Sequence, residues 1–375
     1  MRKNGRSSNG HARVRYAVIG QGYISQIAVL PAFAHAGRNS ELTALISDDR
    51  RKLRELGRRY GVEHLSDYRN ADDLFASGMV DAVYIALPNS MHAEWAIRAA
   101  QAGLHVLCEK PMAVTARECR AMIDVAKHAK VKLMIAYRLH FERGNLAAAE
   151  IVRSRKLGEP RYFDSTFSMQ VKAGNIRLQG DLGGGPLYDI GIYCINAARA
   201  AFSAEPTHVW ALETTRKDPR FKEVPEIVSA VMRFPDDRVA TFTCSFNAGD
   251  RSAYEVVGTR GSLRMDPAYE FAEGLDLEVR IGEKTQKRSF AKRDQFAPQL
   301  LYFSDCVLSG REPEPSGEEG LADVRVIEAL HQSMRSGKMV ATGAGQRSRR
   351  ATMRQEIQRP PVRKPKLVHA QAPHP

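Results

Sequence analysis

From residue 14 to residue 138 the sequence alternates between short β-branched segments and helical segments, and this alternation limits the possible folds more than any other feature. Strands are predicted at 14–20, 41–47, 81–88, 105–110 and 132–138, and helices at 23–36, 50–61, 93–103 and 116–129. Such alternation builds a parallel sheet with right-handed helical crossovers. We therefore predict an α/β fold whose N-terminal part, residues 14–145, is a doubly wound domain of the Rossmann type.

After about residue 145 the pattern changes to one in which apolar residues recur at every second position. Strands are predicted at 161–171, 207–215, 226–234, 239–246, 254–265 and 277–282, and helices at 145–158, 299–310 and 320–337. Alternation of period two is typical of an antiparallel sheet with one covered face. Residues 146–342 are predicted to form an α+β domain with a large, mostly antiparallel open sheet, closed by the last two helices, that binds substrate and mediates oligomerisation.

The net charge of +13 lies mainly in two terminal segments. Residues 1–15 carry five basic residues and no acid, and residues 343–375 carry eight basic residues against one acid. The body between them is nearly neutral, which argues against nucleic-acid binding as the function. Because both segments are poor in apolar residues, we predict disordered basic tails at 1–13 and 343–375.

Composition and cysteine usage indicate the class of protein. The chain is 43% hydrophobic and 26% charged, it has no apolar run long enough to span a bilayer, and its basic N-terminal segment lacks the apolar core of a secretion signal. Its five cysteines show no CxxC spacing, so we expect free thiols in a reducing compartment and no metal site. The predicted location is the cytoplasm, without membrane attachment.

A glycine-rich turn follows the first predicted strand and opens the first helix. Gly20 permits a tight turn, Gly22 lets a pyrophosphate approach the backbone, and Ser25 is small enough for helix and strand to pack. Tyr23 and Ile24 complete this loop, GQGYIS. The motif alone is weak, but its strand-turn-helix context predicts a dinucleotide site.

The end of the second strand indicates which dinucleotide binds. Ser47 stands where NAD sites usually have an acid, and Asp48, Asp49, Arg50, Arg51 and Lys52 follow. A serine with nearby cations can hold a 2′-phosphate. We therefore predict NADP, with NAD possible because Asp48 could bend back to a ribose. Alternatively, residues 48–52 are simply the solvated first turn of a helix.

Two further motifs, PNSMH at 88–92 and CEKPM at 108–112, also follow parallel strands and should face the same crevice. The sequence GDLGGGPLYDIGIY at 180–193 ends in Asp189 and Tyr193, which share a helical face. A lysine, a tyrosine and an aspartate at a nicotinamide suit alcohol–carbonyl redox chemistry, because a proton must leave the substrate oxygen as hydride moves. Lys110, Tyr193 and Asp189 are the candidate catalytic residues. The structural alternative is that Asp189 caps its helix and Tyr193 packs in the core.

These motifs occur in the order G-x-G-x-x-[GAS], P-N-x-x-H, E-K-P, A-Y-R and G-G-G-x-L-x-D-x-G-x-[HY]. In this order and spacing the chain resembles the Gfo/Idh/MocA oxidoreductases from about residue 14 to 342, and it is most similar to the glucose–fructose oxidoreductase branch. The resemblance implies that Lys110 contacts both nicotinamide ribose and substrate hydroxyl. It further implies that Tyr193 is the acid/base and that Asp189 orients the substrate and tunes Lys110.

The resemblance also implies the remaining cofactor contacts. Ser47 and Lys52 would hold the 2′-phosphate, and Asn89, His92 and Glu109 would line the nicotinamide side. Tyr137, Arg138 and Arg177 would lie at the domain junction near the cofactor, and Pro88 is a further candidate cofactor contact. Two residues depart from the branch pattern: Asp48 replaces a frequent glycine, and Ile176 replaces a tryptophan expected before Arg177.

The predicted function is NADP(H)-dependent hydride transfer to or from a sugar or polyol, either as oxidation of an aldose to its lactone or as the reverse carbonyl reduction. Two alternatives stay open: a reductase of a non-sugar carbonyl or imine substrate with the same fold, and a non-catalytic NADP-binding sensor. A sheet face left bare by helices predicts a homodimer or homotetramer.

Overall fold

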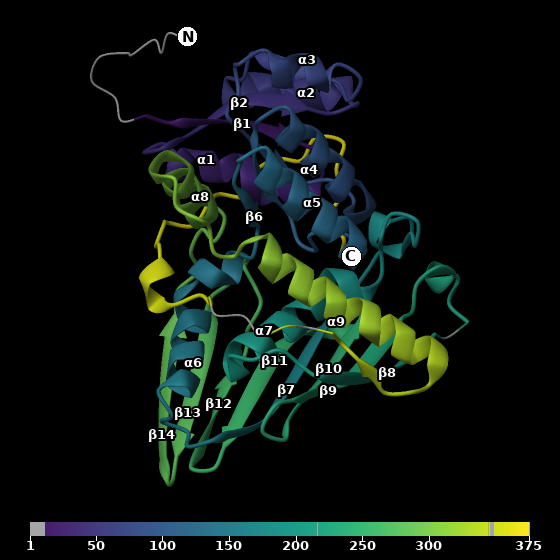
Figure 1. Cartoon of the computed structure of the whole chain (residues 1–375), viewed down its shortest axis with the longest axis vertical. Coiled ribbons are helices and arrows are strands. Elements are labelled where there is room, and N and C mark those ends of the chain that lie inside the picture. The colour runs from purple at the N-terminus through teal and green to yellow at the C-terminus, as the bar shows by residue number, and fades with distance from the viewer. Residues whose placement is uncertain (1–11, 216, 344, 346–348, 375) are drawn as a thin grey trace.

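The chain folds into two layered units, each built around its own sheet (Figure 1). The computed structural model describes residues 12–215, 217–343, 345 and 349–374. The first unit holds a six-stranded parallel sheet with helices on both faces, and the second holds a nine-stranded, mostly antiparallel sheet. The predicted fold class, a Rossmann domain followed by an α+β domain with a large open sheet, is confirmed.

The parallel sheet has the strand order β3-β2-β1-β4-β5-β6. Its strands are β1 (Val14–Ile19), β2 (Ser40–Ile46), β3 (His64–Ser66), β4 (Ala82–Ile85), β5 (His105–Cys108) and β6 (Leu133–Ile135). Its helices are α1 (Leu30–Ala36), preceded by a π-helical turn at Ser25–Val29, α2 (Arg50–Tyr60), α3 (Ala71–Ala76), α4 (His92–Gln101) and α5 (Ala116–His128). The strand order reverses between β1 and β4, so ligands are expected at the carboxyl ends of these strands.

Local sequence accounts for these elements. The central strands are apolar along their length because helices cover both faces, and every residue of β4 is buried. Helix α5 begins with a capping box, in which Thr115 and Glu118 each bond the backbone of the other. Helix α2 begins at Asp49, whose carboxylate accepts from two backbone amides, and ends at Gly61 in the left-handed region.

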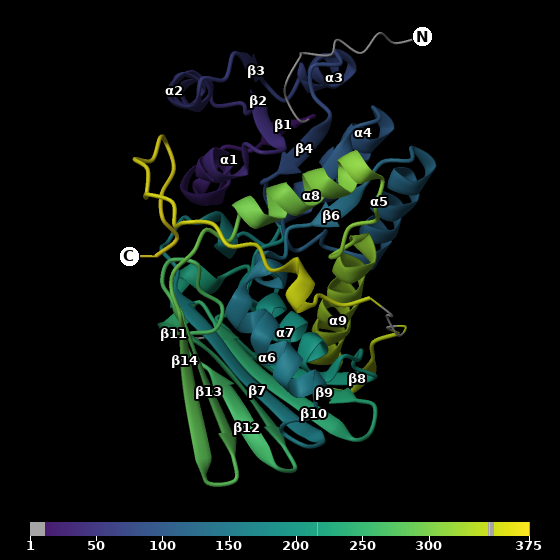
Figure 2. The ribbon, with the colours of Figure 1, turned by 90° about the vertical axis from the view of Figure 1, so that its left-hand side faces the viewer.

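The second sheet has the order β14-β13-β12-β11-β7-β10-β9-β8-β15, with only β7 and β10 paired in parallel. Its strands are β7 (Pro160–Gln170), β8 (His208–Thr214), β9 (Ile227–Phe234), β10 (Arg238–Ser245), β11 (Asn247–Gly258), β12 (Gly261–Met265), β13 (Leu275–Ile281), β14 (Lys284–Phe290) and β15 (Val340–Ala341). Helices α6 (Arg143–Arg153), α7 (Ile192–Phe202) and α9 (Gly317–Ser336) lie on one side of it (Figure 2). Helix α7 thus lies between the large sheet and the first domain (Figure 2).

Strand β14 was not predicted, and its composition explains why. Six of its seven residues, KTQKRSF, are exposed and the segment lacks apolar alternation. It nevertheless pairs along its whole length with β13, at the edge of the sheet. Charged edge strands of this kind resist pairing with other chains, and their sequences carry little strand signal.

Helix α8 (Ala297–Ser309) differs from its predicted place. Its sequence follows the second sheet, so it was expected to close the second domain, but it packs on the first one. Ser304 Oγ lies 2.8 Å from the hydroxyl of Tyr16 in β1, and Asn39 donates to the carbonyl of Leu301 at 2.9 Å. Leu300 and Phe303 are fully buried there. The first domain is therefore completed by a helix from beyond residue 296.

The terminal segments were both expected to be disordered. Most of the N-terminal one lies outside the described residues. The C-terminal segment differs from the expectation, because residues 349–374 run back along both domains and end beside the boundary between them (Figure 2). Val368, in this segment, is buried in the core beneath α1 and α2.

Candidate active site

The glycine-rich turn after β1 has the geometry that a dinucleotide requires. Gly20 has φ +89°, and a Cβ on it would lie 2.4 Å from the carbonyl oxygen of Ala86. A Cβ on Gly22 would meet nothing within 4 Å, so this residue borders open space at the start of the first helix. Tyr23 and Ile24 are half-buried and pack against the core below the turn. The turn can therefore accept a pyrophosphate against its backbone.

The end of β2 favours a 2′-phosphate over a free ribose hydroxyl. Ser47 is buried, and its Oγ accepts from the amide of Asp49 at 3.2 Å. Lys52 Nζ lies 3.9 Å from the Asp49 carboxylate. Asp48 Oδ1 instead accepts from the amide of Tyr68 at 3.0 Å, which ties one oxygen of this carboxylate to the segment after β3. A hydroxyl and an ammonium group thus remain at the position that selects between NAD and NADP.

The segment after β5 holds one buried acid, Glu109, and one half-buried cation, Lys110, whose side chain is 13% exposed. Glu109 accepts a 2.7 Å hydrogen bond from Tyr84 on β4, and burial raises the pKa of its carboxyl group. Lys110 then turns toward the second domain, where its Nζ donates to the backbone carbonyl of Asp189 at 2.8 Å. Glu109 therefore supports the floor of the crevice, and Lys110 crosses it.

Asp189 is held by two cations. Its Oδ1 lies 3.2 Å from Lys110 Nζ and its Oδ2 lies 2.6 Å from Arg177 Nε. Burial acts to raise the pKa of Asp189, but Arg177 and Lys110 together lower it well below the ordinary value. Burial acts in the opposite direction on Lys110, whose pKa is nevertheless raised by Tyr193, Asp189 and Glu109. Both partners therefore carry their charges at neutral pH.

Tyr193 completes the group. Its ring centre lies 4.8 Å from Lys110 Nζ and 5.0 Å from the guanidinium carbon of Arg138, so two cations contact one aromatic ring. Phe167 and Tyr269 hold the ring from the side of the large sheet, at 5.6 and 5.8 Å between centres. Lys110, Arg138 and Tyr193 line one pocket. The three predicted catalytic residues are thus brought together from the loop after β5, from the π-helical turn at Leu187–Gly191 and from α7.

The segment that follows β4 joins the two domains. Asn89 Nδ2 donates to the carbonyl of Gly183 at 2.8 Å, and the amide of Ser90 donates to Leu182. Pro88 immediately precedes this contact. His92 is fully buried, with Nδ1 2.8 Å from the carbonyl of Pro111 and Nε2 3.0 Å from that of Leu87. His92 therefore links two loops of the crevice from behind, whereas Asn89 lies at the domain junction.

Arg138 is buried and makes more contacts than its place in the A-Y-R motif indicated. It is 5% exposed, and its guanidinium donates to the carbonyl of Tyr269 and to the side chain of Gln295. Its face also lies 5.3 Å from the ring of Phe271. These contacts fix the guanidinium that lies against Tyr193. Gln295 and Tyr269 were missed, because no motif connects them to the A-Y-R segment.

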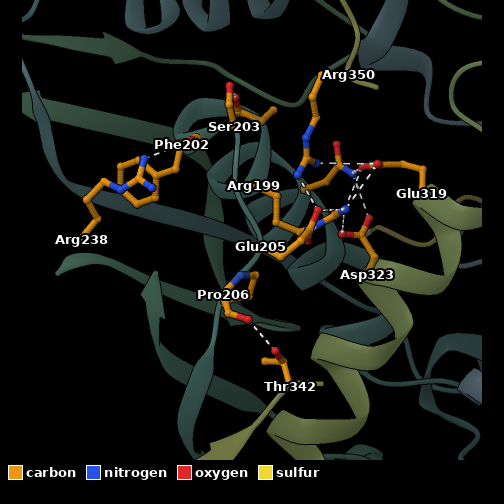
Figure 3. Close-up of polar contacts among 12 residues, drawn as sticks. Arg199, Phe202, Ser203, Glu205, Pro206, Arg238, Glu319, Asp323, Thr342 and Arg350 are labelled. Carbon is orange, nitrogen blue, oxygen red and sulfur yellow. Dashed lines mark hydrogen bonds and ion pairs between the residues drawn. The ribbon is translucent and has the colours of Figure 1, made fainter. Parts of the chain in front are cut away.

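A buried ionic network lies behind Tyr193 and was also missed (Figure 3). Its centre is Arg199, which follows Tyr193 by six residues on α7 and whose side chain has no exposed surface. The acids around it are Glu205, Glu319 and Asp323. Arg350, from the C-terminal segment, also pairs with Glu205. The feature of the sequence that could have revealed this network is an arginine within the apolar run INAARAAF, residues 195–202.

Asn196 connects this network to the active-site pocket. Its Nδ2 donates to Glu319 and to Asp323, both at 2.9 Å, and its Oδ1 lies 2.8 Å from Nε2 of His140. Asn196 follows Tyr193 by three residues and lines the same pocket. The network therefore fixes the helix that carries Tyr193.

The described residues contain no group of three or more histidine, cysteine or acidic side chains placed to hold a metal ion. All five cysteines are buried and free of disulfides. No helix in the described part of the chain is long and apolar enough to cross a membrane.

Family models match most of the two domains. Residues 14–137 match the model described as "Oxidoreductase family, NAD-binding Rossmann fold", and residues 145–264 match the GFO/IDH/MocA C-terminal domain. A D-xylose 1-dehydrogenase [NADP(+)] from Haloarcula marismortui is 33% identical over 328 residues, which cover 85% of this chain and 91% of that protein.

Solved structures agree with these matches. Aldose–aldose oxidoreductase from Caulobacter crescentus, complexed with glycerol, is 39% identical, with a TM-score of 0.84 over 88% of this chain and 99% of that one. A 3-ketoreductase from Actinomadura kijaniata, in complex with NADP and TDP-benzene, is 29% identical, with a TM-score of 0.79 over 86% and 98%. The resemblance noted from the motifs is confirmed, and the chain belongs to the GFO/IDH/MocA family of oxidoreductases.

Proposed function

We propose that this protein transfers hydride between NADP and the C1 carbon of an aldose, oxidising the sugar to its lactone or reducing the corresponding carbonyl. The observation that carries the proposal is the contact of Lys110 with both Asp189 and Tyr193, at the carboxyl edge of the parallel sheet that bears the glycine turn. Relatives that oxidise D-xylose with NADP+ and a solved aldose–aldose oxidoreductase support the substrate class.

The residues take distinct roles in this proposal. The bound nicotinamide supplies the hydride acceptor, or the donor in reverse. The raised pKa of Lys110 keeps its ammonium group charged, so it cannot accept the substrate proton at neutral pH. Tyr193 therefore takes the hydroxyl proton, and Lys110 stabilises the negative charge that develops on the oxygen. Asp189 and Arg177 set the position of Lys110.

Ser47 and Lys52 support NADP as the cofactor. Each can bond a phosphate oxygen, whereas the acid best placed for a ribose hydroxyl, Asp48, already accepts from the backbone of Tyr68. Gly20 and Gly22 fit the pyrophosphate. Pro88, Asn89 and Arg177 are proposed to border the nicotinamide, and His92, Glu109 and Arg138 to support it from behind.

The direct test is to mix the purified protein with NADP+ or NAD+ and a panel of aldoses and polyols, and to follow absorbance of the reduced nicotinamide. Sustained turnover with an aldose and NADP+ is expected. A burst of one equivalent per enzyme would mean that the cofactor is retained and needs a second sugar as acceptor. Cofactor binding without turnover on any sugar would contradict the substrate class and favour a non-sugar carbonyl substrate or a sensor.

The uncovered face of the large sheet supports assembly into a homodimer or homotetramer. Tyr162 and Val239 are register partners on this face and are 49% and 37% exposed. Trp210 and Leu212 on β8 are also exposed. Light scattering of the purified protein checks the oligomeric state, and cell fractionation checks the predicted cytoplasmic location.

A further inference from the structure

The C-terminal segment is anchored to both domains along its length. Arg350 enters the buried network around Arg199, where it pairs with Glu205 (Figure 3). Arg359 Nε then donates to the carbonyl of His35 at the end of α1. Further along, the carbonyl of Lys366 accepts a 2.7 Å bond from Arg59 on α2. This segment therefore runs from the second domain to the outer side of the cofactor domain.

Its last part, residues 366–374, is here called the C-terminal strap, and it docks on the helix that carries the glycine turn. Gln26 is fully buried, and its amide makes two bonds to Val368: Nε2 donates to the carbonyl and Oε1 accepts from the amide, both at 2.8 Å. The same Nε2 donates to the carbonyl of Gln21, inside the glycine turn. Val368 is 3% exposed. The strap is thus bonded to the element expected to bind the pyrophosphate.

The next residue reaches the 2′-phosphate end of the site. His369 Nδ1 lies 3.2 Å from Oδ2 of Asp49, and its Nε2 lies 2.9 Å from Nη1 of Arg51. Asp49 is also the N-cap of α2 and the partner of Lys52. Because the guanidinium of Arg51 can only donate, Nε2 of His369 accepts from it and Nδ1 donates to Asp49, so the imidazole holds an arginine and a carboxylate beside Lys52.

The strap then crosses to the second domain. The carbonyl of Pro373 accepts a 2.9 Å bond from the amide of Lys172, at the start of the loop that leads to Arg177. Only residues 370–372 separate His369 from this bond, and the strap therefore bridges the boundary between the two domains. Figure 2 shows its end at that boundary, on the side where the yellow segment passes from one unit to the other.

From these contacts we infer that the C-terminal strap forms the outer wall of the NADP site and slows release of the cofactor, with His369 strengthening preference for NADP over NAD. This inference rests on the proposed function, because it needs a nicotinamide dinucleotide in the site. In this arrangement a cofactor held between the glycine turn and the strap is released more slowly while the Gln26–Val368 and Pro373–Lys172 bonds stay closed. Loss of His369 releases the guanidinium of Arg51 and the carboxylate of Asp49, so neither is held in place beside the 2′-phosphate, which weakens NADP more than NAD.

The test compares three variants with the full chain, each stripped of nucleotide. They are a chain ending at residue 365, His369→Ala, and the control Arg363→Ala, which removes one exposed positive charge from the same segment. Calorimetry gives Kd for NADP+ and NAD+, and NADPH fluorescence in a displacement experiment gives the release rate. Thermal melting of each variant reports whether it folds.

Truncation is expected to speed NADPH release by about tenfold or more, since several backbone and side-chain hydrogen bonds are lost together. His369→Ala should raise Kd for NADP+ by about 3–10-fold and Kd for NAD+ by less than about twofold, and Arg363→Ala should change neither. If the truncated chain does not fold, His369→Ala decides, because its side chain is half exposed.

Unchanged release and unchanged Kd values in both strap variants would overturn the inference. Tighter binding after truncation would also overturn it, because the strap would then compete with the cofactor. If the full chain binds neither dinucleotide, the proposed function fails and this inference fails with it. Binding by the full chain with no effect of the strap variants overturns the strap alone.

Discussion

Lys110 Nζ contacts Asp189 twice, at 2.8 Å from its backbone carbonyl and at 3.2 Å from its carboxylate. The two residues are 79 positions apart and come from different domains. Because an ammonium group that is largely removed from water needs such partners, the pair fixes the position of the Lys110 cation in the candidate site. The contact between Lys110 and Asp189 therefore lies both at the domain junction and in the candidate reaction centre.

Replacing Lys110 by Met should lower kcat by about 10²–10³-fold, because the developing oxyanion loses its charged donor. Kd for NADP+ should change much less, since the glycine turn and the end of β2 are untouched. Steady-state kinetics and calorimetry measure the two quantities. Lys127→Met is a suitable control, because that side chain is 70% exposed. Full activity of Lys110→Met would contradict the proposed chemistry.

Replacing Tyr193 by Phe keeps the ring between Lys110 and Arg138 but removes the hydroxyl group. We expect kcat to fall by about 10²–10⁴-fold with thermal stability nearly unchanged. A Tyr188→Phe variant is the matched control: that hydroxyl donates to the carbonyl of Val114 on the far side of the same turn. Equal losses in the two variants would indicate a structural role for Tyr193.

Asp189 should make stability depend on pH. Burial opposes its charge, but Arg177 and Lys110 hold its folded-state pKa below the ordinary aspartate value. Its ion pairs therefore stabilise the fold fully above that ordinary value, and the contribution disappears as the pH falls through the folded-state pKa. Asp189→Asn should be less stable than the parent by on the order of 3 kcal/mol at pH 7. Denaturant unfolding from pH 7 to pH 3 should show this difference shrinking; a constant difference would contradict the assignment.

Substitution of Gly20 by Ala should damage both fold and cofactor binding. Its Cβ would lie 2.4 Å from the carbonyl oxygen of Ala86, and φ is +89°. We expect a loss of about 1–3 kcal/mol in the free energy of unfolding and weaker NADP+ binding. Gly37→Ala is the control, because φ there is −59° and a Cβ meets nothing within 4 Å. Similar stability of the two variants would argue against a strained turn.

Replacing Arg199 by Met should destabilise the protein by about 3–5 kcal/mol, because Glu205, Glu319 and Asp323 would lose their central cation while staying buried. Urea unfolding measures the change. Arg233→Met removes an arginine whose side chain is 58% exposed, and we expect less than about 1 kcal/mol. A small effect at Arg199 would mean that water or protonation compensates the acids.

Elements that depend on local sequence patterns were predicted, whereas elements that depend on contacts with distant parts of the chain were not. Strands β1, β2, β4 and β5 were predicted because each contains an apolar run, which is buried by helices on the two faces of the sheet. Gly20 and Gly22 were predicted from a local turn, and Lys110, Asp189 and Tyr193 from motifs at strand and helix ends. Strand β14 carries no such pattern, because pairing with β13 alone makes it a strand.

The sequence by itself determined the two-domain fold class, the dinucleotide turn and the side chains that converge on it, since these depend on periodicity and on residues close together in the chain. Tertiary structure alone decided where α8 docks, how Arg199 is neutralised and that Val368 bonds Gln26 across 342 positions. Those contacts join residues far apart in the chain, and they stabilise the protein only once both surfaces have folded. No local sequence pattern therefore predicts them.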